Sequence, residues 1–417
     1  MTLPEKHLTA LNALVAEIAP TNVFYGPRLE ACGGAAGFES LEDYAARMPF
    51  TTKAELSVDH TAYPPYGTNL TYPVERYTRL HQTSGTSGQP MAWLDTPEGW
   101  QWCLDNWKIV WSRCGARAGE SAIFPFSFGP FLGFWTAFEA AAQIGIRCVP
   151  SGGQNSVERL KMIDRYSPEW LCCTPTYALH LASVAEGEGL DLSDCSVSGL
   201  IVGGEPGGSV PEVRGRIEAA WGARVFDHHG MTEVGPVSYS DIEDPNLLRL
   251  AHESYHVEVV NPETLNPVEK GEVGEVILTT LGRWGSPLLR YRTGDLAEPI
   301  ALEGEDPAAF ALKGGILGRA DDMVVVRGVN LYPSALDAVV RSFDGIGEYQ
   351  VTIDQTQSMT QASIAIENCG ERSDEALKAE FENRLRESFG LRIRALVAEP
   401  NELPQFEMKA KRWNVLK

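Results

Sequence analysis

Residues 83–90 read Thr-Ser-Gly-Thr-Ser-Gly-Gln-Pro, and their residue types suit phosphate binding. Hydroxyl side chains and the backbone N–H groups beside glycine are hydrogen-bond donors for phosphate oxygens. The segment lacks the Gly-Lys-Ser/Thr of a Walker loop, and its flanks at 77–81 and 91–95 are short and rich in aromatic residues. We therefore expect a phosphate-binding loop between two strands. A solvated turn is the alternative that composition alone leaves open.

Two later segments carry side chains that could hold other parts of a nucleotide. The sequence Asp-His-His-Gly-Met-Thr-Glu at 227–233 follows an apolar strand predicted at 223–226. It ends in Thr232 and Glu233, a hydroxyl beside a carboxylate, which can bind a phosphate oxygen and a divalent cation. The sequence Tyr-Arg-Thr-Gly-Asp-Leu at 291–296 contains Asp295, whose carboxylate could accept hydrogen bonds from a ribose diol. Neither segment is specific when taken alone.

Residues 124–135 alternate aromatic residues with glycine and proline, ahead of a helical pattern at 136–144. A glycine-rich aromatic loop that leads into a helix can wall an apolar ligand pocket, because glycine lets the backbone approach the ligand. We expect this loop to favour an aromatic or otherwise apolar substrate. A buried strand and turn is the alternative. The candidate pocket residues are Phe126, Phe128, Phe131, Phe134 and Trp135.

The elements that would position these segments follow a β-α-β rhythm. Strands are predicted at 148–150, 170–174, 199–203 and 223–226, and helices at 156–166 and 177–185. This alternation predicts a largely parallel sheet covered by helices, in which ligands gather at the carboxyl ends of the strands. Further helices are predicted at 8–18, after a capping start at 50–56, and around the tryptophans at 100–107, whose rings we expect to pack in a core.

At 417 residues the chain is long for one core, so we expect two domains of unequal size. The formal net charge of -21 argues against a surface that binds nucleic acid or an anionic membrane. The N-terminus lacks a leader pattern, and no apolar run approaches the roughly 18 residues of a membrane span. We therefore expect a cytoplasmic protein. The 8 cysteines lack C-x-x-C spacing and are expected to be buried free thiols.

Five segments occur in a characteristic order along the chain: 83–90, 203–206, 229–233, 291–296 and 318–323. Together they resemble the adenylate-forming superfamily of acyl-CoA synthetases and peptide-synthetase adenylation domains. The aromatic loop and the sequences at 149–153, 174–178 and 327–333 make the chain most similar to the phenylacetate-CoA ligase group. The resemblance runs from about Tyr77 to the C-terminus. Five ordered motifs are far more specific than any one of them.

The resemblance implies an ATP site. The 83–90 loop would hold the β- and γ-phosphates, Thr232 the α-phosphate and Glu233 a magnesium ion, while Asp295 would bind the ribose hydroxyls. His229 stands where the family has an aromatic such as Tyr, and Gln89 replaces the usual Lys of the loop. The implied nucleotide-binding residues are Thr83, Ser84, Gly85, Thr86, Gly88, Gly204, Glu205, Pro206, His229, Gly230, Asp295 and Arg319.

Residues 319–417 are expected to form a small α+β domain after a large domain at 1–318. Helices are predicted after Pro333 and after Ser373, with strands from Gln350 and Gln361 between them. The arrangement resembles the mobile C-terminal lid of the superfamily. The resemblance then puts the hinge of the lid at Asp321.

The same resemblance assigns two more residues of the lid. Gly328 would lie beside the tunnel for the thiol acceptor. The sequence Glu-Met-Lys-Ala-Lys-Arg at 407–412 resembles the Gly-Lys-Ala ending of the family, with Met408 in place of Gly, which makes Lys409 the catalytic lysine. Lys411 is the second candidate, and a solvated basic tail is the alternative.

The function implied is ATP-dependent activation of an aromatic or apolar carboxylic acid to an acyl-adenylate, followed by transfer to CoA. Thr232, Glu233 and Lys409 would stabilise the in-line attack of the carboxylate on the α-phosphorus. The expected fold is α/β, with mostly parallel sheets covered by helices and a small mobile lid. Expected partners are a small carboxylic acid, ATP, Mg²⁺ and CoA, with no nucleic acid or membrane, and a homodimer is left open. The alternatives are a carrier-protein loader, an amide-forming ligase and a non-catalytic nucleotide-binding relative.

Overall fold

The computed structural model of the chain describes residues 1–83, 90–320, 322, 324–326, 329–356, 360–399, 402–404 and 412–416. The helices are α1 (Leu3–Ile18), α2 (Gly26–Ala31), α3 (Leu41–Arg47), α4 (Lys53–Ala62), α5 (Pro97–Cys114), α6 (Leu132–Gln143), α7 (Ser156–Tyr166), α8 (Pro175–Gly187), α9 (Pro211–Trp221), α10 (Pro333–Arg341) and α11 (Asp374–Phe389), with short 3-10 turns η1 (Val74–Arg76) and η2 (Leu192–Asp194).

The strands of the first part of the chain are β1 (Arg79–Gln82), β2 (Ala92–Asp95), β3 (Ser121–Phe124), β4 (Arg147–Pro150), β5 (Trp170–Cys173), β6 (Gly199–Gly203), β7 (Arg224–His228), β8 (Gly230–Met231), β9 (Gly235–Pro236) and β10 (Ser238–Ser240). The later strands are β11 (Leu247–Leu250), β12 (Tyr255–Val260), β13 (Gly274–Thr280), β14 (Tyr291–Ala301), β15 (Phe310–Arg319), β16 (Val324–Val326), β17 (Val329–Leu331), β18 (Ile346–Asp354), β19 (Gln361–Asn368), β20 (Arg394–Ala398) and β21 (Trp413–Leu416).

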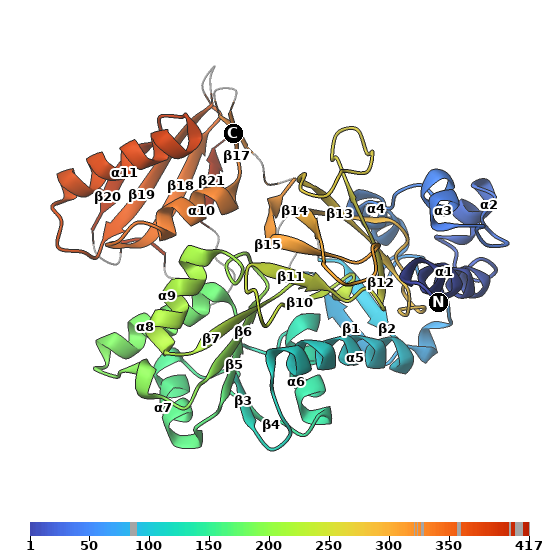
Figure 1. Cartoon of the computed structure of the whole chain (residues 1–417), viewed down its shortest axis with the longest axis horizontal. Helices are drawn as coiled ribbons and strands as arrows, with labels where there is room; N and C mark the ends of the chain where they lie inside the picture. The colour runs from blue at the N-terminus through green and yellow to red at the C-terminus, as the bar shows by residue number, and fades with distance from the viewer. Residues whose placement is uncertain are drawn as a thin grey trace.

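A five-stranded sheet in the order β4-β3-β5-β6-β7 is parallel throughout, which confirms the sheet predicted from the β-α-β rhythm. Helices cover both of its faces (Figure 1). One core joins this sheet to α5 and α6, and a second core joins it to α7, α8 and α9. The carboxyl ends of β6 and β7 therefore lie at one edge of the sheet, as expected.

A second large sheet, which the sequence did not predict, has the order β10-β11-β15-β14-β13-β12 and is antiparallel. Residues 291–296 form the first half of its strand β14. In the pairing of β14 with β15, Asp295 lies directly opposite Arg319. The sheet thus brings together two residues that the family resemblance had assigned to the nucleotide.

The helices α1 to α4 lie beside the antiparallel sheet at the N-terminal side of the molecule (Figure 1). Helix α1 spans the predicted residues and begins with a capping box formed by Thr2 and Glu5. Helix α4 begins with a second capping box, formed by Thr52 and Glu55, where the sequence predicted a capping start.

The hairpin of β1 and β2 confirms that the segment 83–90 connects two strands. Helix α5 follows directly, with Thr96 as its N-cap and Gly115, at φ +91°, as its left-handed C-cap. Trp100 and Trp107 are buried on this helix, in agreement with the predicted core role.

Several elements differ from their predicted bounds, and for two of them the difference moves site residues. Helix α6 begins at Leu132 rather than at 136, because buried positions already recur at helical spacing from Leu132, so Phe134 and Trp135 lie on the helix. Strand β7 extends beyond 226, because Asp227 and His228 continue its pairing with β6.

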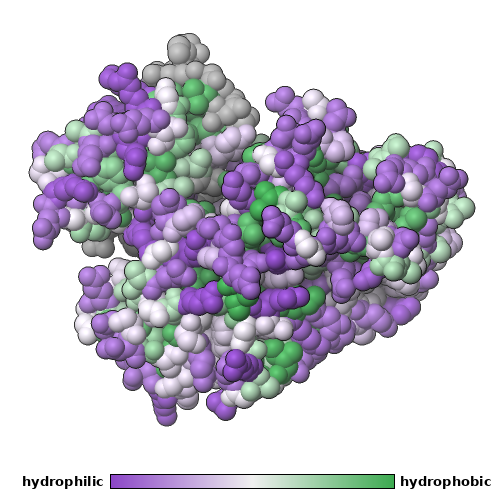
Figure 2. Space-filling model, in the orientation of Figure 1, coloured by the Kyte–Doolittle hydropathy of each residue, from purple (hydrophilic) through white to green (hydrophobic). Residues whose placement is uncertain are grey.

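The C-terminal residues have a sheet and a core of their own. The sheet has the order β20-β19-β18-β21, and its core, which also takes in α10 and α11, consists of residues between Val326 and Ala395. Helix α11 is capped by Ser373 and closed by Gly390 in the left-handed conformation, as predicted. Helix α10 contacts α9 and β15 of the preceding part. Figure 2 shows the surface hollowed where the two parts meet.

The outer surface shown in Figure 2 is mainly hydrophilic, with hydrophobic residues in separate patches. Within the described ranges, none of the helices combines the length and the apolarity that a membrane crossing needs. All cysteines are free thiols, as predicted, but the predicted burial holds for only four of them: Cys103, Cys114, Cys172 and Cys173. Cys32, Cys148 and Cys195 are partly exposed, and Cys369 is exposed. Burial raises the pKa of Cys172 to about 12, so this thiol is inert at neutral pH.

Candidate active site

Gln82 and Thr83 fix the start of the phosphate-loop segment. The hydroxyl of Thr83 accepts a hydrogen bond from the backbone N of Met91 at 3.0 Å, which closes the base of the loop. The backbone N of Gln82 donates to the carbonyl of Pro130 at 2.7 Å, and its carbonyl accepts from the hydroxyl of Thr232 at 3.5 Å. The start of the loop, the aromatic segment and Thr232 therefore meet. Ser84, Gly85, Thr86 and Gly88 lie outside the described residues.

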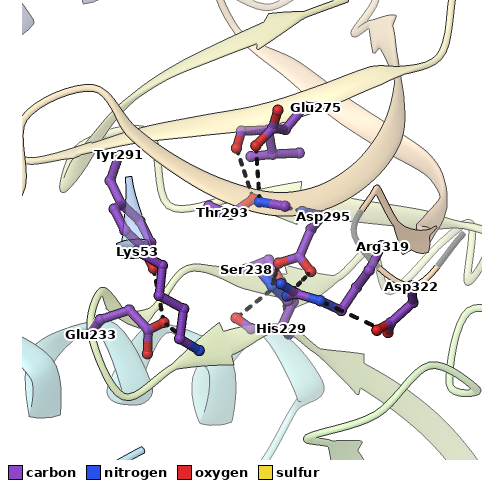
Figure 3. A network of polar contacts seen from close by, with 12 residues as sticks. Lys53, His229, Glu233, Ser238, Glu275, Tyr291, Thr293, Asp295, Arg319 and Asp322 are labelled. Carbon is purple, nitrogen blue, oxygen red and sulfur yellow. Dashed lines mark hydrogen bonds and ion pairs between the residues drawn. The ribbon is translucent and has the colours of Figure 1, made fainter. Parts of the chain in front are cut away.

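Glu233 is the buried carboxylate of the site, with 3% of the residue exposed. Its Oε1 accepts a hydrogen bond from the hydroxyl of Tyr291 at 3.0 Å and lies 3.9 Å from Nζ of Lys53 (Figure 3). Burial, together with the charge of Glu233, raises the pKa of Tyr291 well above its usual value, so the hydroxyl remains a donor at neutral pH. Both contacts involve the same carboxylate oxygen, which leaves Oε2 as the oxygen that can meet a cation.

Lys53 was not predicted from the sequence as a site residue. Its position is fixed from both sides, because Thr51 forms a parallel bridge with Tyr291 and Thr52 caps helix α4 in its box with Glu55. Lys53 is the first residue of α4, so its ammonium reaches Glu233 from the N-terminal end of that helix. The capping pattern at 50–56 identified the helix, but nothing in the sequence linked it to a segment so far along the chain.

Arg283, also missed, supports the backbone of Thr232 and Glu233, the residues that the family resemblance assigns to the α-phosphate and to magnesium. Its Nη1 donates to the carbonyl oxygens of Thr232 at 2.9 Å and Glu233 at 2.8 Å. Its Nε and Nη2 donate to the two carboxylate oxygens of Asp95 at 2.6 and 2.7 Å. Burial by itself lowers the pKa of Arg283, but the charge of Asp95 outweighs this effect and the net shift is upward. Since Asp95 ends β2, this guanidinium joins the loop hairpin to the Thr-Glu segment.

Asp295 lies between two basic side chains (Figure 3). Its Oδ2 is 2.8 Å from Nε2 of His229, and its Oδ1 accepts a hydrogen bond from Nη1 of Arg319 at 3.1 Å. The backbone N of His229 also donates to the hydroxyl of Ser238 at 2.9 Å. Three residues that the sequence assigned to the nucleotide therefore form one contiguous polar cluster.

Gly204, Glu205 and Pro206 follow β6, beside the end of β7. Gly204 has φ +87°, a conformation that favours glycine. The carboxylate of Glu205 accepts a hydrogen bond from the backbone N of Thr176 at 2.8 Å, in the first turn of α8, where the helix dipole favours a negative charge. Because Gly203 pairs with His228 at the ends of β6 and β7, residues 204–206 leave the sheet beside the segment that leads to Gly230, the first residue of β8.

The aromatic segment packs largely on itself. Phe126 is 7% exposed and stacks on Phe134 with ring centroids 4.0 Å apart. Phe128 contacts Phe126 at 5.0 Å and Trp135 at 5.1 Å. These four rings belong to the core of α5, α6 and the parallel sheet or pack against it. Phe131, half-buried and 6.2 Å from Phe134, is outside that core.

The remaining predicted site residues, Asp321, Gly328 and Lys409, lie outside the described residues, as does Lys411. Within the described part of the chain, no three side chains of His, Cys, Asp or Glu form a group that could hold a metal ion by themselves. A cation at Glu233 would therefore need ligands in addition to these described side chains.

Comparison with known proteins agrees with this geometry. The chain matches the AMP-binding enzyme family over residues 80–282 and the AMP-binding enzyme C-terminal domain over residues 328–414. It is 29% identical over 433 residues to the phenylacetate-coenzyme A ligase of Thermus thermophilus, in an alignment that covers 97% of this chain and 96% of that protein.

The chain also superposes on crystal structures of 2-hydroxyisobutyryl-CoA ligase. For that enzyme in the postadenylation state with R3-HIB-AMP, the TM-score is 0.91 at 27% identity, covering 99% of this chain and 89% of the other. For the thioesterification state with 2-HIB-AMP and CoA, the coverage is the same, the identity is 28% and the TM-score falls to 0.73. The same share of both chains is aligned in the two comparisons, but the TM-score is lower in the second. This indicates that segments of the chain are arranged differently relative to one another in the thioesterification state. By its motifs, fold and family matches, the chain belongs to the AMP-binding enzymes of the adenylate-forming superfamily, and it is similar to phenylacetate-coenzyme A ligases over most of its length.

Proposed function

We propose that this protein is an acid–thiol ligase that activates a carboxylic acid with ATP and transfers the acyl group to CoA. The observation that carries the proposal is the convergence of Thr232, Glu233, His229 and Asp295 on one site, in a chain that superposes closely on a ligase bound to R3-HIB-AMP. The named relatives act on phenylacetate and 2-hydroxyisobutyrate. In this chain, Phe131, the ring of the aromatic segment that lies outside the core, supports an aromatic or apolar acid.

In the first half-reaction, a carboxylate oxygen of the acid attacks the α-phosphorus of ATP, the bond to the β-phosphate breaks and pyrophosphate leaves. No general base is needed, because the carboxylate is already the nucleophile. The residues then have two tasks, orientation and stabilisation of charge. The hydroxyl of Thr232 would hold the α-phosphate, the loop from Thr83 the outer phosphates, and Asp295 the ribose hydroxyls.

The site fits a magnesium ion at Glu233. This carboxylate is buried, it is oriented through one oxygen by Tyr291, and Mg²⁺ is commonly held by one or two carboxylates together with substrate phosphates. Bound there, magnesium would neutralise phosphate charge. Lys53, close to the same carboxylate, adds a second positive charge to this side of the site.

In the second half-reaction, the thiol of CoA attacks the acyl carbonyl and AMP leaves. We propose that the residues from 319 onward form a lid that turns about Asp321 between the two half-reactions, bringing Lys409 to the first and Gly328 to the second. The two TM-scores against one relative support a change of arrangement between states, since the present arrangement is closer to the postadenylation state. The end of β15 at Arg319 supports the boundary after 318.

The decisive measurement is exchange of labelled pyrophosphate into ATP with a panel of aryl, arylacetic and short-chain acids in the presence of Mg²⁺. We expect exchange that depends on the acid, followed by thioester formation when CoA is added. Absence of exchange with every acid would overturn the proposal and favour the non-catalytic nucleotide-binding relative. Pyrophosphate exchange without transfer to CoA, but with transfer to a carrier-protein thiol or to an amine, would change only the proposed acceptor of the acyl group.

A cytoplasmic location and a homodimer remain predictions, to be checked by cell fractionation and light scattering.

A further inference from the structure

His228 is the last residue of β7, two residues before Gly230, and its side chain lies on a definite face of the sheet. Successive side chains of a strand point to opposite faces. Phe226 belongs to the core shared with α5 and α6, so His228 points to the same side, toward the aromatic segment. Asp227 points to the other side, where its Oδ2 accepts a hydrogen bond from Ser209.

The ring of His228 is held in one orientation and one tautomer. Its Nδ1 lies 2.6 Å from the carbonyl oxygen of Ser238, and because a carbonyl can only accept, Nδ1 carries the proton. Burial lowers the pKa of His228 to about 4, so the ring is neutral at physiological pH. Nε2 is then a bare acceptor, and no hydrogen bond to it is found within the described part of the chain.

The unpaired atom Nε2 of His228 lies close to the residues that we assign to the α-phosphate. A Cβ atom added to Gly230 would come within 3.2 Å of Nε2 of His228, so the two are close neighbours. Gly230 precedes Thr232, the proposed α-phosphate ligand, by two residues of extended chain. Nε2 is therefore near the place where the carboxylate of the acid must meet the α-phosphorus, and on the side of the aromatic segment.

A second, independent group beside it is also unpaired. Trp107 of α5 is 3% exposed, and its Nε1 is buried without a hydrogen-bond partner within the described residues. The ring centroids of Trp107 and His228 are 4.2 Å apart. An unpaired buried donor is costly and uncommon, which indicates a partner other than the described residues.

We infer that His228 and Trp107 together select an acid whose acyl part carries a hydroxyl group. A hydroxyl both donates and accepts, so it can donate to Nε2 of His228 and accept from Nε1 of Trp107. A purely apolar acid would leave both atoms unpaired. The inference rests on the proposed function and narrows its substrate to hydroxylated acids.

The test compares matched acids in pyrophosphate exchange by the full-length enzyme. Each pair differs in one group: mandelate with 2-phenylpropanoate, 4-hydroxyphenylacetate with 4-methylphenylacetate, and 2-hydroxy-2-methylpropanoate with 2,2-dimethylpropanoate. Sites built to bind a hydroxyl discriminate strongly against analogues that lack it. We expect at least one hydroxylated acid to exceed its methyl counterpart in kcat/KM by on the order of 10²-fold or more.

Variants then assign the preference to the two rings. His228→Phe keeps a flat ring against Trp107 but has no acceptor, and the hydroxyl-to-methyl ratio of kcat/KM should fall to about one. His228→Gln, which retains an acceptor at the end of its side chain, should recover part of the ratio. Trp107→Phe should lower the ratio as well. Its matched control is Trp111→Phe, on the same helix, because Nε1 of Trp111 already donates to the carbonyl of Ala137 at 3.1 Å. Thermal unfolding of each variant shows whether it is still folded, so that a change in the ratio is interpreted only for folded protein.

The outcomes separate this inference from the proposed function. If no acid supports exchange, the proposed function fails and this inference falls with it. If acids are activated but every methyl counterpart equals its hydroxylated partner, the ligase stands and the assignment of His228 and Trp107 is overturned. A hydroxyl preference that survives in folded His228→Phe enzyme also overturns it.

Discussion

The guanidinium of Arg283 and the carboxylate of Asp95, 188 residues apart in the sequence, form a two-point ion pair that is fully buried. The remaining nitrogen of Arg283 holds the carbonyls of Thr232 and Glu233. One side chain therefore determines how the phosphate-loop hairpin sits against the segment that we assign to the α-phosphate and magnesium.

Removing one partner of this pair should destabilise the fold strongly. Asp95→Asn leaves a buried cation without its counter-charge, and breaking a buried pair costs about 3–5 kcal/mol in the free energy of unfolding. Urea unfolding measures this loss. In the double variant Arg283→Met with Asp95→Leu no charge remains, so stability should largely return while pyrophosphate exchange stays low, because the two carbonyls have lost their donor. Full exchange in the double variant would remove the positioning role from Arg283.

Tyr291 should tune the response to magnesium through Glu233. Tyr291→Phe removes the hydroxyl that donates to Oε1, and a hydrogen bond to a charged group contributes about 1.5–3 kcal/mol. We expect the Mg²⁺ concentration for half-maximal exchange to rise by roughly ten-fold or more. Tyr44→Phe is the control, since it loses an equally buried hydroxyl that contacts Thr279 at 2.8 Å, and its magnesium response should match that of the parent.

Lys409 should be needed for one half-reaction only. Removing a cationic donor from developing phosphate charge typically costs on the order of 10²- to 10³-fold in rate, so Lys409→Ala should slow pyrophosphate exchange by about that factor. Thioester formation from a supplied acyl-adenylate should be nearly unchanged. Lys411→Ala is the matched comparison. If Lys409→Ala exchanges at the full rate and Lys411→Ala does not, the role moves to Lys411, and two silent variants would dismiss the lid mechanism.

Two phenylalanines of the aromatic segment should behave differently. Phe126 lies in the core, so Phe126→Ala should lower the free energy of unfolding by about 3–5 kcal/mol. Phe131 lies outside that core, and Phe131→Ala should change the ranking of acids more than the KM for ATP. Equal losses for all acids in Phe131→Ala would indicate a packing role there too.

Buried histidines should make stability fall in acid. Burial lowers the pKa of His256 to about 3, against about 6.5 in the unfolded chain. Between these values the unfolded state binds one more proton, so this residue lowers stability by up to about 1.4 kcal/mol per pH unit as pH falls from 6.5 toward 3. Unfolding of His256→Phe, referred to its own value at pH 8, should show a correspondingly shallower decline. Parallel pH profiles for the two proteins would contradict the assignment.

The sequence alone was enough to predict the candidate site residues and the local secondary structure. Thr232, Glu233 and Asp295 were identified because their motifs occur in order along the chain. The capping box of Thr52 and Glu55, the parallel sheet and the helix around Trp107 follow from local patterns whose spacing already encodes the structure.

Tertiary structure decided which parts meet. The antiparallel sheet, the contact of Lys53 with Glu233 and the clamp of Arg283 on the same segment all join residues far apart in the chain. Side-chain periodicity reports which face of an element is buried, but it carries no information about the partner on that face. For the same reason, only the fold showed that His228 faces Trp107, with one nitrogen hydrogen-bonded to Ser238 and the other without a hydrogen bond from the described residues.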